Sequence, residues 1–501
     1  MEGKTEQKKM FEFPGVRYIF AANGFLGLCV TLALRVNINV AIVAMVNGTA
    51  VYGHHNKTTS EECAAGSVPN NSSAQDTPQD GEFAWSPQLQ GVVLGSFYYG
   101  YVITQIPGGR LAELVGGKWV FGLGNLATAL LSLLVPTAAR THVGWLIAVL
   151  AVEGLAQGVT VPALNVLLGR WLPDSEKAVL NTAVVIGVNV GTVSAMPLAG
   201  FLCRSQLFGG WPAAFYVIGM FGCAWFVLWI FLVTDTPATH PFITKKELEY
   251  ITADQRRDQD KKLPPIPWLK IAKSVPFWSV IITRVCQDWS FYIMVNDLPT
   301  FFATILHFEI QKNSFLSSVP HLMQTVVGLS VAFFADLVIR KKMAPTNFVR
   351  KFCNSVSGFG SALGLLGVCF AGCDVTLNVI LFMYLISVAG FCFGGHALSL
   401  LDISPEYSGT LMGICNTLSN INGFLAPLFV GALTDKQQTL HQWRIVFGTT
   451  AALLTLATVI FAVFSTAEKQ EWATPPTVTE CDSGDKSRLI GDSYGSINKE
   501  L

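Results

Sequence analysis

Charged side chains set inside long apolar segments are the residues of this chain with the clearest chemical potential. Arg35 lies in the segment GFLGLCVTLALRVNINVAIVAMV, which is long enough to cross a bilayer as a helix. A charge at that depth costs about 3 kcal/mol even on insertion scales, so it needs an opposite charge or a water-filled cavity. A structural pair with a carboxylate of a neighbouring helix is one explanation. The alternative, which we favour, is that Arg35 binds a negatively charged solute.

A second group of charges lies in the segment SVIITRVCQDWSFYIMVNDLPTFF. Arg284 and Asp288 are four residues apart and share one helix face, whereas Asp297 lies nine residues beyond Asp288 and is expected on the opposite side. Two interpretations are equally supported. Either the two charges only neutralise each other, or Arg284 contacts a solute while Asp288 orients Arg284 or carries a coupling ion. Elsewhere, burial disfavours the charged form of Glu153, which makes this carboxyl a candidate proton acceptor.

Three further side chains are candidates for a part in transport: Tyr99 and Tyr101 can add hydrogen bonds to the same solute, and His396 can take part in proton or ion coupling. Tyr99 and Tyr101 lie in the segment GSFYYGYVITQ, and His396 lies in FGGHALSLLD. Tyrosines at helical spacing and single histidines on helices more often pack than bind, so packing is the alternative for all three. Asp402 precedes a Ser-Pro pair, where we expect it to cap the following helix.

Composition and hydropathy indicate an all-α membrane protein. Apolar residues make up 51% of the chain and charged residues 13%, against about a quarter in soluble domains. We predict twelve transmembrane helices in two six-helix halves. The expected spans are 17–46, 88–108, 118–137, 143–168, 178–203, 212–234, 276–305, 314–336, 350–371, 376–400, 405–434 and 443–465.

The polar segment ITKKELEYITADQRRDQDKKLPP separates the two halves and indicates a charged, partly helical connector. Lysine and arginine gather in the N-terminal tail, in this connector and in the loops on the same side of the spans, which places both termini in the cytosol. The predicted divisions are a cytosolic tail 1–16, an N-terminal half 17–234, the connector 235–275, a C-terminal half 276–465 and a cytosolic tail 466–501.

The first outer loop, 47–86, supports the same orientation. It carries Asn-x-Ser/Thr acceptors for glycosylation, which requires exposure to the secretory lumen, at Asn56, Asn70 and Asn71. Three cysteines lie in or near outer segments and can oxidise, with their pairing left open: Cys63, Cys203 and Cys373. No spacing of cysteine and histidine indicates a metal site.

A glycine-rich motif between spans 2 and 3, GGRLAELVGGK, has the composition of a tight turn with a polar latch. Its glycines allow two helices to turn back sharply, and its acid and base can form an ion pair that breaks when the halves rock. The latch residues are Gly109, Glu113, Gly116 and Lys118. A degenerate copy, FFADLVIRKK, follows span 8 with Asp336 and Arg340. An ordinary turn with solvated charges explains neither the repeat nor its position.

This repeat resembles the signature of the major facilitator superfamily, whose two six-helix halves enclose a midplane site. Within it, the segments GSFYYGYVITQIPGG, EGLAQGVTVPA, NSFLSSVPHL and LDISPEYSGTLMGICNT are similar to the anion transporter branch. That branch holds sialin, the vesicular glutamate transporters and the sodium–phosphate cotransporters, and the similarity covers residues 15–475. It implies alternating access for a small organic or inorganic anion, coupled to protons or sodium, with Arg35 as the main anion contact.

The chain departs from that branch at the fourth span. Sialin-like members carry an arginine and two glutamates there, where this chain has Leu150, Glu153 and Gln157. Proton coupling through the second glutamate is therefore in doubt, and Arg284 is a candidate replacement for the missing arginine. Ser399 also stands where relatives often carry asparagine, which indicates a different substrate preference.

The C-terminal tail carries two patterns read by clathrin adaptors, which indicate a lysosomal, endosomal or vesicular membrane, with the plasma membrane as the alternative. An acidic dileucine pattern uses Asp485, Leu489 and Ile490, and a tyrosine pattern uses Tyr494 and Ile497. We expect a monomeric transporter with no enzyme activity, no cofactor beyond H⁺ or Na⁺ as coupling ion, and no nucleic-acid partner. A carrier of cationic or zwitterionic solutes is the alternative, and a non-transporting receptor is a weaker one.

Overall fold

A computed structural model describes most of the chain between residues 15 and 473. The described residues are 15–47, 81–173, 176–205, 207–259, 266–306, 308, 310–404, 407–435 and 439–473. The predicted glycosylation and sorting residues and one of the outer cysteines lie outside the described residues: Asn56, Asn70, Asn71, Asp485, Leu489, Ile490, Tyr494, Ile497 and Cys63.

The N-terminal half is built from long apolar helices that run back and forth along one axis. They are α1 (Val16–Met45), α3 (Pro87–Val115), α4 (Gly117–Thr141), α5 (Val143–Gly158), α6 (Thr160–Trp171), α7 (Lys177–Arg204) and α8 (Pro212–Leu232). Helices α5 and α6 follow each other across Val159 and form one rod. At Gly116 the backbone turns with φ of 107°, a conformation that glycine adopts without strain.

The C-terminal half repeats this pattern with more interruptions. Its elements are α11 (Val275–Tyr292), the π-helix η4 (Ile293–Asp297), α12 (Leu298–Thr304), α13 (Ile310–Arg340), α14 (Thr346–Ala371), α15 (Val375–Ala389), the 3₁₀ turn η5 (Gly390–Gly394), α16 (His396–Ile403), α17 (Ser408–Asn420), α18 (Asn422–Thr434) and α19 (Leu440–Phe464). Between the halves lie a 3₁₀ turn and the short helices α9 (Lys245–Gln259) and α10 (Trp268–Ala272).

The predicted fold class is confirmed. In the described part of the chain, nine helical stretches are long and apolar enough to cross a membrane. The other three of the twelve rods are α3, the interrupted α11–η4–α12 and the interrupted α17–α18. Large apolar side chains such as Phe231 and Phe370 remain exposed on the outside of the bundle, as expected for a surface that faces lipid.

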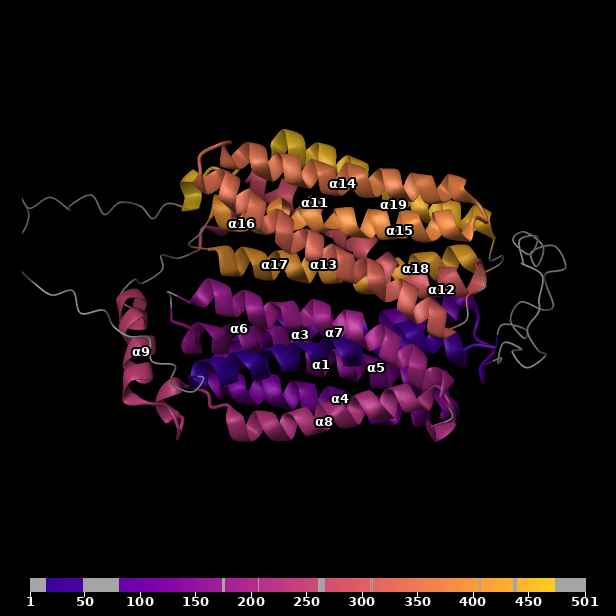
Figure 1. Ribbon diagram of the computed structural model, residues 1–501, viewed down its shortest axis with the longest axis horizontal. Coiled ribbons are helices and arrows are strands. Elements are labelled where there is room, and N and C mark those ends of the chain that lie inside the picture. Colours follow the sequence, from indigo (N-terminus) through magenta and orange to yellow (C-terminus); the bar gives the residue numbers. More distant parts are fainter. Residues whose placement is uncertain are drawn as a thin grey trace, which may run out of the picture.

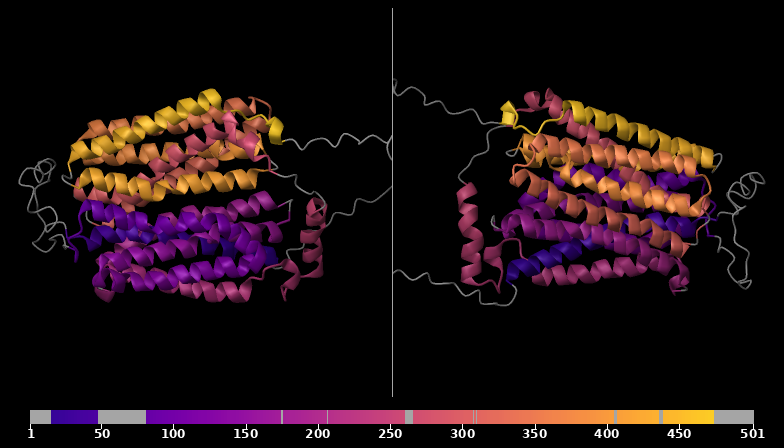
Figure 2. Two further views of the ribbon diagram at one scale, coloured as in Figure 1. Left: turned by 180° about the vertical axis from the view of Figure 1, so that it is seen from behind. Right: turned by 45° about the horizontal axis from the view of Figure 1, so that its top comes forward.

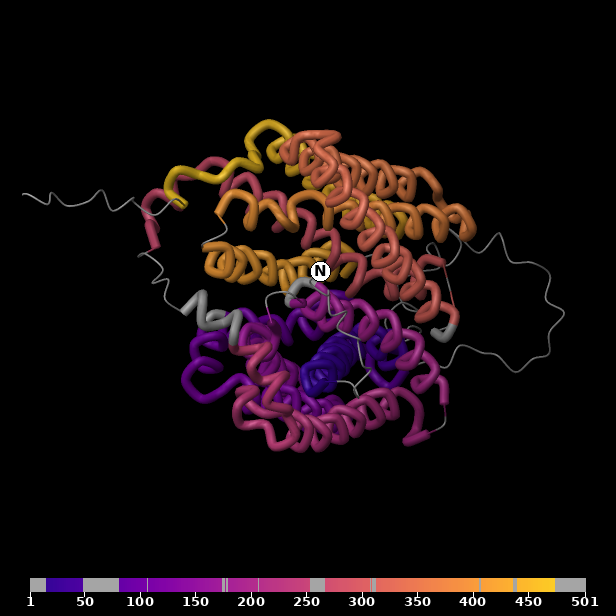
Figure 3. The backbone as a smooth tube through the Cα atoms, turned by 60° about the vertical axis from the view of Figure 1, so that its left-hand side comes forward, coloured from indigo at the N-terminus to yellow at the C-terminus, as the bar shows by residue number. Residues whose placement is uncertain are grey.

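The two halves form separate bundles that lie side by side, and α9 lies across one end (Figure 1). The views from behind and from a tilted angle show the same separation (Figure 2). Seen from nearer the α9 end, the N-terminal helices gather on one side and the C-terminal helices on the other (Figure 3). We call the opposite end, which carries the α1–α3 connection, the outer end, following the orientation that the lysine and arginine bias predicts.

Apolar side chains fill both halves, and the cluster in the C-terminal half continues onto aromatic side chains of α3. Phe121, Trp225 and Trp229 pack together in the N-terminal half, and Phe301, Phe382 and Phe447 do so in the C-terminal half. The halves meet through α3 with α18 and through α7 with α13. The contact between α3 and α18 is as extensive as contacts between neighbouring helices within a half.

The outer ends of α3 and α18 approach closely enough to require glycine. A Cβ atom on Gly431 would lie 2.7 Å from the carbonyl oxygen of Pro87, and one on Gly95 would lie 3.2 Å from the Cα of Phe424. The backbone nitrogen of Gln88 also donates a hydrogen bond of 3.2 Å to the Asp435 carboxylate across the two halves. We call this contact between 87–95 and 422–435 the outer seam, and it is closed in this structure.

Two of the three outer cysteines can be compared directly. Cys373 is disulfide-bonded, whereas Cys203 is a free, buried thiol. These two cysteines therefore do not pair with each other.

Candidate functional site

Arg35 lies where the two halves meet, inside a set of aromatic rings. Its guanidinium carbon is 4.6 Å from the ring centre of Tyr98, 4.7 Å from Tyr101, 5.5 Å from Phe97 and 5.9 Å from Tyr292. Its Nε donates to the Tyr98 hydroxyl at 3.4 Å, and its Nη2 donates to the Tyr292 hydroxyl at 3.0 Å. These contacts hold the cation by its faces and by two of its donors.

No described carboxylate forms an ion pair with Arg35, so a structural pair of the kind considered from the sequence is not seen within the described residues. Aromatic faces attract a cation but do not cancel its charge. The positive charge of Arg35 is therefore not neutralised by any described carboxylate.

A chain of hydrogen bonds connects Arg35 to both halves. The Tyr292 hydroxyl donates to Asn420 Oδ1 at 2.6 Å, and Asn420 Nδ2 donates to Gln105 Oε1 at 3.3 Å. Arg35 and Gln105 belong to the N-terminal half, and Tyr292 and Asn420 belong to the C-terminal half. Any change in the angle between the halves must therefore stretch or remake this chain.

The tyrosines beside Arg35 are only partly those expected from the sequence. Tyr101 is there, but Tyr99 lies elsewhere and packs against Phe424 with ring centres 5.2 Å apart. Tyr98 and Tyr292 supply the hydroxyls instead. Residues three positions apart, such as Tyr98 and Tyr101, share a helix face, whereas residues two positions apart, such as Tyr99 and Tyr101, do not. Helical spacing from Tyr101 could therefore have indicated Tyr98.

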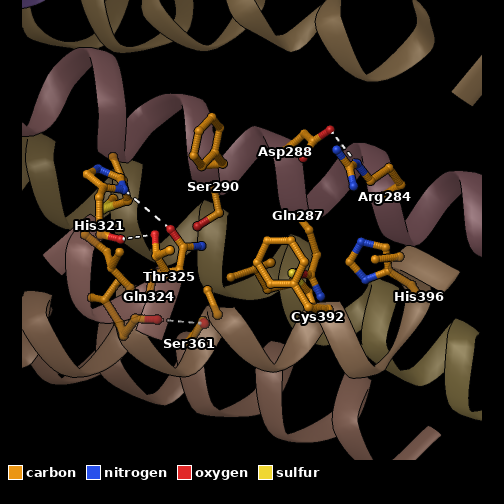
Figure 4. A pocket seen from close by; sticks show the side chains of 18 of the residues that line it. Arg284, Gln287, Asp288, Ser290, His321, Gln324, Thr325, Ser361, Cys392 and His396 are labelled. Atoms are coloured by element: carbon orange, nitrogen blue, oxygen red, sulfur yellow. Dashed lines mark hydrogen bonds and ion pairs between the residues drawn. The ribbon is translucent and has the colours of Figure 1, made fainter. Parts of the chain in front are cut away.

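The second predicted charge pair forms as expected. Arg284 Nε donates to Asp288 Oδ2 at 2.8 Å, and the exposed fractions of the two side chains are 35% and 18%. Both side chains line a cavity of about 220 Å³ (Figure 4). The pair is therefore accessible from a space large enough for a small solute.

This cavity is lined almost wholly by the C-terminal half, with Asn189 of α7 as the contribution of the other half. Arg284, Gln287 and His396 lie toward one end of it, and His321, Gln324 and Thr325 lie toward the other (Figure 4). Arg35, Tyr99, Tyr101, Glu153 and Ser399 are not among its lining residues. Of the predicted site residues, Arg35 and Tyr101 thus form one group, and Arg284, Asp288 and His396 line the cavity as another. Helix α11 contributes to both groups, whereas Tyr99, Glu153 and Ser399 belong to neither.

His396 is held by an amide network rather than by a charge. Its Nδ1 lies 3.0 Å from Asn354 Oδ1, which also accepts a hydrogen bond of 3.4 Å from Gln287 Nε2. The Ser357 hydroxyl donates to Gln287 Oε1 at 3.4 Å. Ser399 is buried and donates to the carbonyl of Gly395 in its own helix, so its hydroxyl is already used.

His321 is a cavity residue that the sequence did not single out. It is 5% exposed, its Nδ1 lies 3.5 Å from Gln324 Oε1, and its Nε2 has no partner among the described residues. It follows Pro320 within α13. The signal available was a histidine inside an apolar span, which is costly without a polar environment.

The fourth span carries one buried acid and two departures from the related sequences. Glu153 is 3% exposed and forms no hydrogen bond or ion pair with another described residue. Gln157 donates through Nε2 to the carbonyl of Thr31 at 2.8 Å, one turn before Arg35. Leu150 is buried among apolar side chains of the outer part of this half. Gln157 therefore anchors the helix that carries Arg35.

The predicted latch is arranged differently from the expectation. Glu113 pairs with Arg110 on the same helix at 2.5 Å and not with Lys118, because α3 continues to Val115 and brings positions three apart together. Lys118 donates through Nζ to the Ile230 carbonyl at 2.9 Å. Gly109 lies on α3, where a Cβ atom would lie 3.7 Å from the Cβ of Pro162, an ordinary contact distance, and Gly116 forms the turn.

The acid that binds the start of α4, next to Gly116, is Asp235, which was not predicted from the sequence. It accepts from the backbone nitrogen of Lys118 at 3.2 Å and forms an ion pair with Arg170. In the other half, Asp336 and Arg340 form an exposed pair at 2.8 Å within α13.

Asp402 does not cap α17, which begins at Ser408. It accepts from Arg350 through both carboxylate oxygens, at 2.7 and 3.4 Å. Each half therefore holds a buried or half-buried Arg–Asp pair toward its cytosolic end.

Comparisons with known proteins agree with this architecture. The sequence profile of the Major Facilitator Superfamily matches residues 24–427. The chain is 37% identical to sialin from Ovis aries over 91% of this chain and 90% of that protein. It is 35% identical to a putative inorganic phosphate cotransporter from Drosophila melanogaster, over 92% and 86%, and 34% identical to vesicular glutamate transporter 1 from Xenopus tropicalis, over 96% and 81%.

A solved structure shares the fold. A bacterial homologue of the human lysosomal transporter Spinster, in an inward-facing and unoccupied conformation, superposes with a TM-score of 0.66 at 13% identity, over 91% of this chain and 98% of that chain. At that identity the likeness concerns the fold alone. The profile match and the identities to curated relatives establish that the chain belongs to the major facilitator superfamily, in the anion transporter branch that holds sialin, the phosphate cotransporters and the vesicular glutamate transporters.

Proposed function

We propose that this protein is a secondary active transporter that moves a small anion across the membrane by alternating access. The observation that carries the proposal is Arg35, a cation at the contact between the halves that no described carboxylate neutralises. Its planar fork of donors suits a carboxylate or a phosphate group. An anion bound there would be released when the halves rock and the chain through Tyr292 and Asn420 is remade.

The cavity beside Arg284 supplies a second contact for the same solute. Arg284 keeps about a third of its side chain exposed although Asp288 pairs with it, so it has donors left for a ligand. This arrangement supports the interpretation that Arg284 replaces the arginine missing from the fourth span. The names of the relatives point to phosphate, sialic acid or glutamate as candidate substrates.

Glu153 is the candidate site for a coupling proton, because it is buried and unpaired within the described residues. Sodium is the alternative coupling ion. The relatives favour a lysosomal or vesicular membrane, and the tail patterns would bring the protein there through clathrin adaptors.

A carrier of cationic or zwitterionic solutes is a weaker proposal. It relied on the extra aspartates of the seventh span, but Asp288 is already paired with Arg284 in the cavity wall. A cationic substrate would have to compete with that guanidinium for the same carboxylate. The geometry therefore favours an anion.

Uptake into proteoliposomes tests the proposal. Labelled phosphate, glutamate, sialic acid and urate would be offered under a pH gradient and then under a sodium gradient. Arg35→Ala should abolish saturable uptake of the transported anion, whereas Arg444→Ala, which removes an exposed arginine at the outer end, should not. Uptake of an anion that is equal in the two variants would contradict the proposal.

A further inference from the structure

The contact between α1 and η4 joins the two halves on the outer side of Arg35. Asn39, one turn beyond Arg35, donates through Nδ2 to the carbonyl of Val295 at 3.3 Å and to Asn296 Oδ1 at 3.0 Å. Both acceptors lie in η4, where the helix adds a π turn between α11 and α12. Isolated π turns inside helices are frequent at functional sites.

Asp297 is the last residue of this π turn, and its carboxyl is buried without a partner. The residue is 3% exposed, and its Oδ2 meets no donor among the described residues. It occupies the N-cap position of α12, but its side chain makes no capping hydrogen bond. The neighbouring Asn296 is fully buried, and its Nδ2 is also unpartnered within the described residues. The polar side chains of η4, the element that contacts α1, thus have only part of their hydrogen-bonding capacity used.

No cation neutralises Asp297 from the elements that pack against η4, which are α1, α11, α12 and α18. Their charged or titratable side chains are Arg17, Tyr18, Cys29, Arg35, Arg284, Cys286, Asp288 and Tyr292. None of them forms an ion pair or hydrogen bond with Asp297; Arg35 is held by tyrosines and Arg284 by Asp288. A carboxylate buried without a partner is costly, so the acid at this position holds a proton.

The fate of that proton depends on the outer seam. When 87–95 separates from 422–435, α1 must also leave η4, because Asn39 and Asn296 belong to opposite halves. Water then reaches the carboxyl, and an aspartate in water is ionised at neutral pH. We propose that Asp297 is a proton-binding site of the outer gate, protonated while the outer seam is closed and releasing its proton to outer water when the seam opens.

This inference rests on the proposed alternating access and adds to it a second acid, separate from Glu153, whose protonation is tied to one gate. The direction of the pH effect on opening follows from mass action. Because the closed state binds the proton and the open state releases it, raising the pH favours opening. One proton released per opening changes the ratio of open to closed molecules by up to about tenfold per pH unit.

Hydrogen–deuterium exchange on the full-length protein in nanodiscs, without any substrate, tests this directly. Exchange in 87–95 and 422–435, corrected for the intrinsic effect of pH, should rise with pH toward the tenfold limit. Asp297→Asn should remove most of this rise, and Asp297→Glu should keep it. The matched control is Asp374→Asn at the outer end, where the aspartate caps α15 and asparagine caps equally well, so the rise should persist.

An unchanged pH response in Asp297→Asn would overturn the proposal, and so would a wild-type outer seam that shows no response. Asp297→Ser is a second neutral variant that carries the same test should Asp297→Asn not fold. The readout needs no transported solute, so a failure to identify the anion leaves it unaffected. Conversely, an unchanged response would remove the Asp297 site while leaving Arg35-dependent uptake in place.

Discussion

Arg35→Lys separates the charge of this residue from its shape. The substitution keeps a positive charge but removes the planar fork, which in the structure makes two hydrogen bonds and lies against four aromatic rings. A lysine ammonium is a point charge that cannot match both oxygens of a carboxylate or phosphate in one plane. A hydrogen bond to a charged group is worth about 1.5–3 kcal/mol. Losing one such bond to the anion weakens its binding about 10- to 150-fold.

The assay is the concentration dependence of uptake into proteoliposomes for the anion that wild type transports. We expect the KM to rise by that factor in Arg35→Lys and saturable uptake to disappear in Arg35→Ala. Arg444→Ala is the control for loss of an arginine, and thermal unfolding in nanodiscs checks that each variant is folded. A KM for Arg35→Lys equal to that of wild type would refute the argument from shape.

A double-mutant cycle extends the same test to the ring that positions Arg35. Tyr292→Phe removes the hydroxyl that accepts from Arg35 at 3.0 Å and donates to Asn420 at 2.6 Å. If Tyr292 acts through Arg35, its effect on KM should be smaller in the Arg35→Lys background than in wild type. Strictly additive effects would show that the two side chains act independently.

Three further changes have expected outcomes that follow from single contacts. Asp288→Asn removes the carboxylate that pairs with Arg284 at 2.8 Å, so the affinity for the anion should rise. The free energy of unfolding should fall by about 1–3 kcal/mol, because an ion pair is lost. Loss of binding in equilibrium titrations would favour a cationic substrate instead. Gly431→Leu should hold the outer seam open, because the larger side chain does not fit against α3, and should reduce uptake more than tenfold. Hydrogen exchange in the outer seam should increase. Exchange equal to that of wild type would contradict the close packing. Glu82 accepts from Arg140 at 3.0 and 2.8 Å, and this hydrogen bonding lowers the pKa of the Glu82 carboxyl. The stabilisation by this hydrogen bonding is present above the ordinary glutamate pKa of about 4.3 and is lost as the pH falls through the lowered pKa of Glu82. The difference in Tm between wild type and Glu82→Gln should therefore be constant near neutral pH and disappear in acid.

The positions of the helices could be predicted closely because hydropathy is a local property. The expected span 143–168 corresponds to Val143–Trp171, and the expected 276–305 corresponds to Val275–Thr304. The interruptions inside spans could not be predicted, since the π turn at Ile293–Asp297 and the 3₁₀ turn at Gly390–Gly394 depend on which neighbours pack against them. Apolar length indicates where a helix crosses but not where it breaks.

Site residues could likewise be predicted where the evidence is local in the sequence, but not where it depends on contacts between distant segments. Arg35 and the pair of Arg284 with Asp288 could be found because a charge in an apolar segment, or two charges one turn apart, is visible along the chain. Tyr292 could not be assigned to Arg35, because it reaches that side chain from another helix of the other half. Glu113 was expected near Lys118 because the turn was placed too early; the extra turns of α3 bring it to Arg110 instead.

The two ionisable groups left unmatched at the contact between the halves give a physical reason for linking anion binding to protonation of Asp297. Arg35 has no described carboxylate, and Asp297, on the outer side of it, has no described cation. Each is tolerated only under a condition: Arg35 is surrounded by aromatic rings, and Asp297 must hold a proton. An anion that binds Arg35 removes the first imbalance, and a proton on Asp297 removes the second. Because the outer seam lies on the outer side of both groups, closing around a bound anion is most favourable when the proton is also present, so anion binding and protonation of Asp297 favour the same closed state.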